Sequence, residues 1–247
     1  PTVFLFDQIY GMTNYEPVLE GNGYSTAAAD VMVKYLKMDD TELLEKPVDT
    51  GEYKVSVTFK ENDLYSAATV SDDFQITPKS IAGAVITLEK DELDFNGNDQ
   101  SPAVMKVTLE SKELTEDTDY TITSGNTGKI LGTYTLTIIG AGNYTGTATK
   151  EWKITKTHIT GISAPDVTAE YDGMGHGITI SGQPDSAEIK YGDSEGTYTL
   201  DTCPVYTDVG ENTIYFEISA EGYEKYTGSA KVKITKKALS VTAKDQK

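Results

Sequence analysis

Histidine and cysteine, the residues that often serve as nucleophiles, bases and metal ligands, are scarce in this chain. It has two histidines, His158 and His176, and a single cysteine, Cys203. Neither histidine has a second histidine four residues away, which is the spacing of a helical zinc pair. A cysteine nucleophile needs a histidine partner, and a linker histidine and one in the glycine-rich string YDGMGHG are poor candidates. We therefore predict that all three are structural or incidental, with no catalytic residue, no metal ligand and no enzyme activity.

Carboxylates are abundant, but they form no recognisable site. With 39 acidic residues, chance pairs are unavoidable, and glycoside hydrolysis needs its two carboxylates in a cleft, which a small β-sandwich seldom has. The string DFNGNDQS resembles a calcium loop, but Asp99 and Met105 stand where an EF-hand has glycine and glutamate. We predict no cofactor, with weak calcium binding at TEDTD (115–119) or MDD (38–40) as the alternative. The sequence identifies no ligand-binding residue.

The net charge of −18 argues against several classes of partner. All 21 basic residues are lysine, whereas arginine is the usual reader of phosphates and guanine edges. We therefore expect no nucleic-acid partner, and the negative charge also opposes docking on anionic lipid. No apolar run approaches the roughly 20 residues of a membrane span, so we expect no membrane insertion.

The single cysteine cannot form an internal disulfide. That fits a bacterial surface protein or a cytosolic protein better than a secreted animal protein of this size. The chain opens on PTVFLFD, without the charged region of a signal peptide, and stops in ALSVTAKDQK, which looks like the start of a strand. We interpret the sequence as part of a longer protein.

Three landmarks recur in the same order along the chain, which is the mark of internal repeats. Each repeat opens with an aromatic–glycine string: IYG (9–11), DFNG (94–97) and EYDG (170–173). A glycine then introduces an alternating segment, at Gly51, Gly132 and Gly210. Similar endings align at Ile76, Ile154 and Ile234, with spacings of 78 and 80 residues. We predict three homologous modules at 1–79, 80–156 and 157–236, with 237–247 as the first strand of a truncated following module.

The elements that carry these landmarks have the period of β-strands. In YKVSVTFK (53–60), apolar and polar residues alternate without a slip, and the segments at 134–138 and 214–218 do the same. Such alternation indicates strands with one buried and one wet face. Short strands separated by Gly, Asn and Asp turns predict small antiparallel β-sandwiches, with β-grasp-like modules as the alternative. Only residues 25–36 carry a helical hint, and we allow one helical turn there at most, with helix below about a tenth of the chain.

The links between the predicted modules are very short: TPKS (77–80), TKTH (155–158) and TKKA (235–238). Links of this length leave adjacent modules little freedom, which favours an extended string. The tyrosines just before the final strands, Tyr65, Tyr144 and Tyr226, are expected to plug the end of each sandwich.

The sequence resembles a known family of repeats. The strings DYTITSGNTGKILGTYTLTIIGAGNYTGT (119–147) and EYDGMGHGITISG (170–182) look like the tandem modules called MBG and YDG domains. Those modules occur in long secreted and cell-wall-attached proteins of bacteria, especially Gram-positive ones. The resemblance covers nearly the whole chain and implies an extracellular location, serial repetition and no catalytic residues. The string DTGEY (49–53) is also similar to the Asp-x-Gly-x-Tyr corner of immunoglobulin-like domains.

Two functions follow from this reading. The first is a non-catalytic stalk or spacer that presents other domains of a large secreted or cell-wall-attached bacterial protein. The alternative is a set of adhesin modules that bind host or dietary glycans, mucin or matrix protein, with exposed tyrosines as the platform. We expect a monomer whose partner is a glycan or a host surface protein. The sequence does not decide whether a lysine–asparagine isopeptide cross-link stiffens any module.

Overall fold

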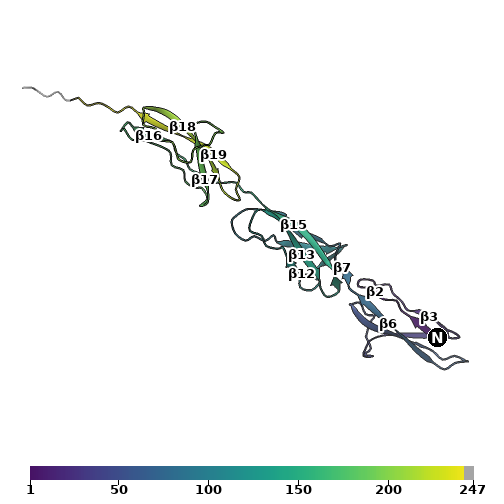
Figure 1. Ribbon diagram of the computed structural model, residues 1–247. Helices are drawn as coiled ribbons and strands as arrows, with labels where there is room; N and C mark the ends of the chain where they lie inside the picture. The colour runs from purple at the N-terminus through teal and green to yellow at the C-terminus, as the bar shows by residue number, and fades with distance from the viewer. Residues whose placement is uncertain (242–247) are drawn as a thin grey trace, which may run out of the picture. The chain divides into compact units, whose positions relative to one another are not determined.

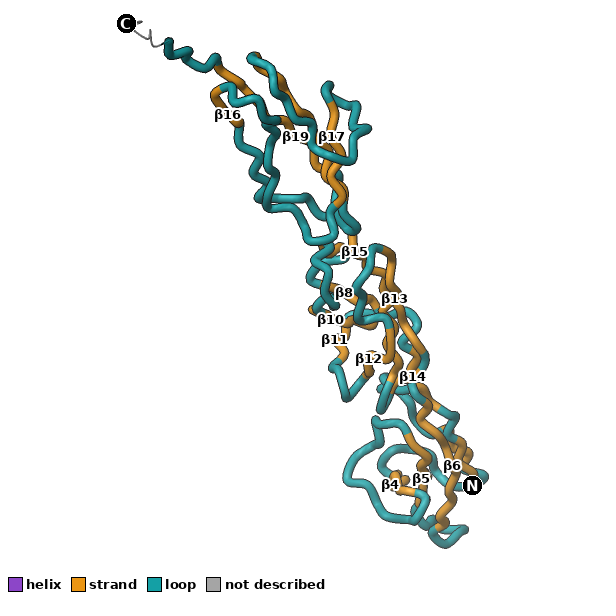
Figure 2. Tube along the Cα trace, turned by 60° about the vertical axis from the view of Figure 1, so that its left-hand side comes forward, coloured by secondary structure: helices purple, strands orange, loops and turns teal. Residues whose placement is uncertain are grey.

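The computed structural model describes residues 1–241, and they belong to two compact units. Unit 1 comprises Pro1–Asp91, Ser101–Thr127 and Tyr134–Trp152; unit 2 comprises Glu92–Gln100, Gly128–Thr133 and the chain from Lys153 on. The described residues form strands, turns and loops and contain no helix (Figure 2). The prediction of an all-β chain is thereby confirmed. A helix able to cross a membrane is accordingly absent from residues 1–241.

The first four-stranded sheet lies in unit 1 and has the order β2-β6-β5-β4. Its strands are β2 (Gln8–Ile9), β6 (Ala68–Thr77), β5 (Gly51–Phe59) and β4 (Val31–Lys37). The alternation in β5 has the predicted effect, since Val55, Val57 and Phe59 are fully buried. Strands β1 (Thr2–Phe4) and β3 (Val18–Glu20) form a separate antiparallel pair, and Val3 of β1 belongs to the same core.

The segment with the helical hint is a strand. Residues 28–30 form a turn, and β4 follows, paired antiparallel with β5 from Val31 opposite Phe59 to Lys37 opposite Tyr53. The aligned segment AEIKY of the third repeat is also a strand, β17 (Glu188–Gly192). Cross-strand pairing with β5 holds residues 31–37 in a strand, and only a turn forms at the alanines before it, despite the high helix propensity of alanine.

Residues 79–155 contribute two larger sheets and the short two-stranded pair of β7 (Lys79–Ser80) and β14 (Tyr144–Thr145). Strands β8 (Val85–Leu88), β10 (Val104–Leu109) and β11 (Lys112–Leu114) make one of the larger sheets. The other has the order β12-β13-β15-β9, formed by β12 (Tyr120–Ser124), β13 (Gly132–Gly140), β15 (Thr147–Thr155) and β9 (Glu92–Asp94). Trp152 is buried in unit 1, where its indole nitrogen donates to the Gly125 carbonyl at 2.7 Å and its ring stacks on Tyr134.

The last sheet lies in unit 2 with the order β16-β19-β18-β17, and Figure 1 shows these four strands together. They are β16 (Val167–Glu170), β19 (Tyr226–Thr235), β18 (Gly210–Ser219) and β17. Alternate residues of β18 and β19 point into one core: Ile214, Phe216, Ile218, Ala230, Val232 and Ile234. Burial of each large apolar side chain contributes about 1.5–3 kcal/mol, so these two strands anchor the sheet.

The three four-stranded sheets share one topology. In each, the last strand pairs antiparallel with the strand before it where the pairing is described, as β6 does with β5 and β19 with β18. The opening strand differs from the antiparallel rule, because β2, β9 and β16 each pair parallel with the last strand. In each sheet the opening strand and the last strand therefore lie side by side and run in the same direction.

The predicted module boundaries stay a prediction, since the compact units are two and their limits cross residues 80–156. The predicted strand at 237–247 also stays open. Residues 237–241 have no regular strand, and residues 242–247 lie outside the described part of the chain.

Candidate functional site

The three tyrosines expected to plug the sandwich ends have three different environments. Tyr144 is buried, with 4% of its surface exposed, whereas Tyr65 is 46% exposed. Tyr226 is half-buried on the unit 2 core, where its ring stacks on Phe216 with centroids 6.3 Å apart. The position that matches Tyr144 in the third repeat is Tyr223, because the link residues Lys79 and Thr157 pair parallel with Tyr144 and Tyr223, respectively.

In unit 1 the ring of Tyr144 meets the first aromatic landmark, Tyr10. The two rings lie edge to face, with centroids 5.2 Å apart and an interplanar angle of 77°. This is a favoured geometry for an aromatic pair. The short parallel pair of β7 (Lys79–Ser80) and β14 (Tyr144–Thr145) lies beside it. We call this arrangement joint 1.

A polar clamp completes joint 1. The Asn143 side-chain oxygen accepts from the Thr50 backbone N–H at 2.8 Å and from the Thr50 hydroxyl at 3.0 Å. The Asn143 amide nitrogen donates to the Asp49 carboxylate at 2.8 Å. Asn143 thereby ties the turn before β14 to the corner before β5, with its side-chain oxygen accepting two hydrogen bonds and its nitrogen donating one.

Unit 2 contains the same arrangement, which we call joint 2. The second aromatic landmark, Phe95, lies edge to face against Tyr223, with centroids 5.8 Å apart and an angle of 82°. The Thr157 N–H donates to the Gly222 carbonyl at 3.0 Å, as the Lys79 N–H does to Asn143 in joint 1. The joint is tight, since a Cβ at Gly222 would lie 2.0 Å from the Phe95 ring.

The landmark aromatics are held in place by a backbone bond that occurs three times. The N–H groups of Tyr10, Phe95 and Tyr171 each donate to the carbonyl of the threonine that ends the last strand, Thr77, Thr155 and Thr235, at 2.8, 2.9 and 2.9 Å. The string that opens a repeat is therefore fixed beside the residue that closes it.

A hollow of about 570 Å³ lies beside joint 1, lined by Tyr10, Gly11, Lys79, Leu109, Glu110, Ser111, Lys112 and Tyr144. The Lys112 ammonium lies 5.3 Å from the Tyr10 ring centroid and 5.1 Å from that of Tyr144. Hydrogen bonds with Tyr144 and Tyr10 raise the pKa of Lys112. The cation bridges the two rings, which strengthens the joint by cation–π attraction.

The histidines and the cysteine do not come together with a base or an oxyanion donor in any contact that the structure shows. His158 is exposed, while His176 lies 3.0 Å from the Asp172 carboxylate. The Met174 N–H and His176 hold the pKa of Asp172 below its usual value. The half-buried Cys203 thiol makes weak contacts to backbone carbonyls, and burial raises its pKa. A raised pKa lowers the thiolate fraction, which opposes a role as nucleophile.

The acidic strings serve local turns. The Asp39 carboxylate accepts from Thr41 and Asp119 from Thr115, both backbone N–H groups at 3.0 Å, and Asp40 pairs with Lys54 at 2.5 Å. Among residues 1–241, no three His, Cys, Asp or Glu side chains gather as metal ligands. The expectation of no cofactor, with weak calcium binding as the alternative, stays a prediction.

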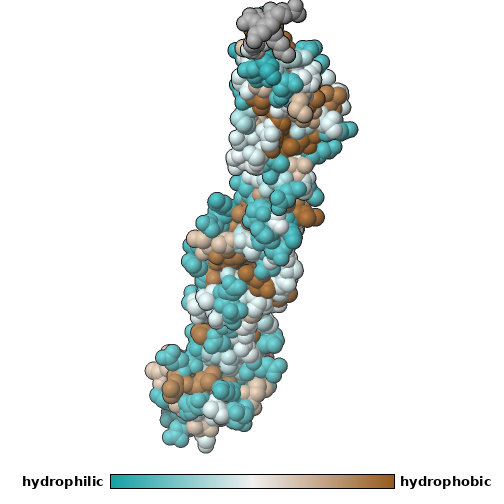
Figure 3. All heavy atoms as spheres, turned by 90° about the vertical axis from the view of Figure 1, so that its left-hand side faces the viewer, coloured by the Kyte–Doolittle hydropathy of each residue, from teal (hydrophilic) through white to brown (hydrophobic). Residues whose placement is uncertain are grey.

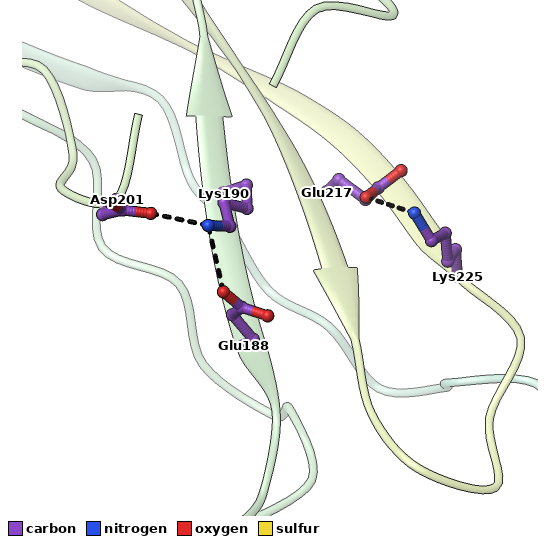
Figure 4. Close-up of polar contacts among 5 residues, drawn as sticks. All are labelled: Glu188, Lys190, Asp201, Glu217 and Lys225. Carbon is purple, nitrogen blue, oxygen red and sulfur yellow. Dashed lines mark hydrogen bonds and ion pairs between the residues drawn. The ribbon is translucent and has the colours of Figure 1, made fainter. Parts of the chain in front are cut away.

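The exposed face of the unit 2 sheet carries ion pairs. Figure 4 shows Lys190 between Glu188 and Asp201, with nitrogen–oxygen distances of 3.1 and 2.7 Å, and Lys225 against Glu217 at 2.8 Å. Exposed pairs contribute little to stability. On the face in Figure 3, polar residues predominate and apolar ones form separate clusters.

Sequence reasoning found Tyr10 and Phe95 only as landmarks, and it missed Asn143 and Lys112 altogether. The one available signal was the Asn in GNYTG, which stands in one repeat and is replaced by Gly222 in the next. A difference between repeats at a contact position indicates a difference in its partner.

No protein-family model matches the chain, and no curated protein matches it. Several solved structures are similar over most of its length. Extracellular cadherin domains 3–6 of protocadherin gamma B2 have 10% identity and a TM-score of 0.29, covering 85% of this chain and 68% of that one. A SusE-like surface-located polysaccharide-binding protein from the heparin utilisation locus of Bacteroides thetaiotaomicron has 11% identity and a TM-score of 0.26, covering 95% and 53%.

The N-terminal eight Ig domains of Down Syndrome Cell Adhesion Molecule have 10% identity and a TM-score of 0.32, covering 95% of this chain and 36% of that one. This chain thus spans about half of the polysaccharide-binding protein and about a third of the Ig-domain structure. At these scores the likeness carries no inference about family, partner or function. The resemblance to MBG and YDG modules stays a prediction.

Proposed function

We propose that this chain is a non-catalytic repeat segment of a large secreted or cell-wall-attached bacterial protein, acting as a spacer that presents other domains. The observation that carries the proposal is the aromatic joint, which occurs in both units with the same edge-to-face ring pair and the same backbone bond from the link. An enzyme or a single binding site has no need of a repeated joint, whereas a spacer needs each link to resist bending.

The joints are suited to that task because each one restrains a link in two ways. A parallel backbone pairing fixes the link itself, at β7 with β14 and at Thr157 with Tyr223. An edge-to-face ring pair then fixes the start of one repeat against a turn of the next. Two attachments at separate points oppose rotation more strongly than a short link alone.

Small-angle scattering of the whole chain tests the proposal. A compact chain of 247 residues has a radius of gyration of about 18 Å, and a spacer must give a clearly larger value. Tyr10→Ala, which removes one ring of joint 1, is expected to broaden the pair-distance distribution. Tyr171→Ala is the matched control, since it changes the equivalent landmark outside both joints. A compact radius for the native chain would remove the spacer proposal.

Adhesion is the second candidate, and the hollow beside joint 1 favours it. Two tyrosine rings and the polar groups of Lys79, Glu110 and Ser111 line it, which is the mixture of apolar and polar groups that small-molecule sites use. Glycan, mucin and matrix-protein arrays test this candidate with the native chain and with Glu110→Ala. Binding that Glu110→Ala abolishes supports adhesion, and a blank array contradicts it.

A further inference from the structure

The third aromatic landmark, Tyr171, has the same backbone bond and the same type of following glycine as Tyr10 and Phe95, but among the described residues no tyrosine ring packs against it. Its N–H donates to the carbonyl of the threonine that ends the last strand, Thr235, as in the other two repeats. Gly173 has a positive φ of 81°, close to the 89° of Gly11 and the 76° of Gly97. Tyr10 and Phe95 are half-buried by their ring partners. Tyr171 is 44% exposed, and no ring pair involves it in the described part of the chain.

The third repeat also has a corner equivalent to the one that Asn143 clamps in joint 1. In the antiparallel strand pairs, Gly210 lies opposite Ile234, just as Gly51 lies opposite Ile76. Asp208 and Val209 are therefore the counterparts of Asp49 and Thr50, the two residues that Asn143 clamps. Val209 is 46% exposed.

The space in front of this corner is open. A hollow of about 460 Å³ is lined by the continuous segment 205–212, which includes Asp208 and Val209. In unit 1 the Asn143 side chain fills the equivalent position against Asp49 and Thr50.

The two joints also show which residue the clamp selects. Where the corner is Asp-Thr-Gly (49–51), the facing turn supplies Asn143. Where the corner is Ile-Leu-Gly (130–132), the facing turn has Gly222 at that position, which offers no side-chain donor. The third corner, Asp-Val-Gly (208–210), has the carboxylate of the first kind.

We propose that Tyr171 and Asp208 form the receiving half of a third joint, and that its occupant is a β-repeat carrying a Gly-Asn-Tyr-Thr-Gly turn, linked after Thr235 as residues 78–155 are linked after Thr77. The tyrosine of that turn packs edge to face on Tyr171. Its asparagine donates to the Asp208 carboxylate. This inference rests on the proposed spacer function and names the kind of repeat that the chain accepts.

The direct experiment joins a copy of residues 78–155 to Thr235 in place of residues 236–247 or, in a second version, a copy of residues 156–235. Hydroxyl-radical footprinting then measures the oxidation rate of Tyr171 against Tyr10. The first extension is expected to lower the rate at Tyr171 several-fold, to the level of Tyr10, and Asp208→Asn is expected to reverse part of that protection. An unchanged rate at Tyr171, or equal protection by both extensions, overturns the proposal.

Two measurements on the unextended chain keep the proposal testable if an extension does not fold. Tyr10→Ala must lower the melting temperature clearly, while Tyr171→Ala leaves it unchanged, because only Tyr10 packs against a partner ring. A double-mutant cycle with Asp49→Ala and Asn143→Gly must show non-additive effects. Equal losses at both tyrosines, or additive effects in the cycle, contradict it. Scattering of the native chain judges the spacer function separately, since neither measurement depends on overall dimensions.

Discussion

Two glycines with nearly the same backbone conformation show how strongly a single residue depends on its surroundings. Gly222 has φ +84° and Gly173 has φ +81°, and both conformations disfavour any L side chain by about 1–2 kcal/mol. A Cβ on Gly222 would meet the Phe95 ring at 2.0 Å, whereas one on Gly173 would meet nothing within 4 Å. Comparing the two glycines therefore separates the effect of the close contact at joint 2 from the effect of the backbone conformation.

We therefore expect Gly222→Ala to destabilise the protein more than Gly173→Ala. Both variants carry the same conformational cost, and Gly222→Ala adds an overpacking cost of about 1–3 kcal/mol. Chemical denaturation of the two variants measures the difference. Equal free energies of unfolding would show that the Phe95 ring moves aside freely and that joint 2 is not tight.

The tyrosines of the unit 1 core predict the pH dependence of stability. Burial is the largest cause that raises the pKa of Tyr15 and of Tyr35 to about 12. Tyr15 also donates a hydrogen bond to the Pro47 carbonyl, which only the protonated phenol can do.

A folded-state pKa above the unfolded value of about 10 means that the folded state holds the proton more tightly. The resulting stability is fully present below pH 10 and is lost as the pH rises through 12. We expect an alkaline unfolding transition between about pH 10 and 12. Tyrosinate absorbance and circular dichroism measure it. Tyr15→Phe cannot ionise and should shift the transition to higher pH, and an unshifted transition would show that Tyr15 does not contribute to it.

At the scale of elements, the turn before β14 and the corner before β5 are joined by one side chain. Asn143 is suited to this position because it donates to a carboxylate and accepts from Thr50 at the same time. An aspartate of the same size can accept but cannot donate.

We expect Asn143→Asp to weaken joint 1 more than Asn143→Ala does. Alanine loses hydrogen bonds to a charged group, at about 1.5–3 kcal/mol, while aspartate adds repulsion from the Asp49 carboxylate. Proteolysis at the link residues 77–80 and the melting temperature report the effect. Asp49→Asn in the Asn143→Asp background restores one donor and should recover stability; no recovery would argue against the clamp.

At the scale of the whole molecule, the charge of −18 raises the question of bound cations. The acidic strings at 38–40 and 115–119 use carboxylates in local turns and an ion pair. Asp39 and Asp119 thereby hold backbone turns, and Asp40 is neutralised by Lys54.

We expect chelation to leave the fold unchanged. Titration with EDTA, and with calcium up to about 1 mM, the affinity range of weak extracellular sites, should not shift the melting temperature, with magnesium as the control for ionic strength. A calcium-specific rise in melting temperature would identify a cation site and replace the prediction of no cofactor by its alternative.

The sequence by itself determined that the chain is built of strands and which side chains of those strands face inward. Val55, Val57 and Phe59 alternate with polar residues, and all three are buried as predicted. Alternation is a local property of an extended chain, because successive side chains point to opposite faces. The scarcity of histidine and cysteine likewise needed no structure.

Only the tertiary structure decided what the landmarks contact. Tyr10 meets Tyr144, and Asn143 meets Asp49 and Thr50, across most of unit 1 in sequence. The predicted equivalence of Tyr226 with Tyr144 was wrong: the extra residues in EGYEKYTG (221–228) put Tyr223 at the joint. Periodicity fixes the direction of a side chain, whereas its partner depends on how distant strands are placed. The folded chain alone sets that placement.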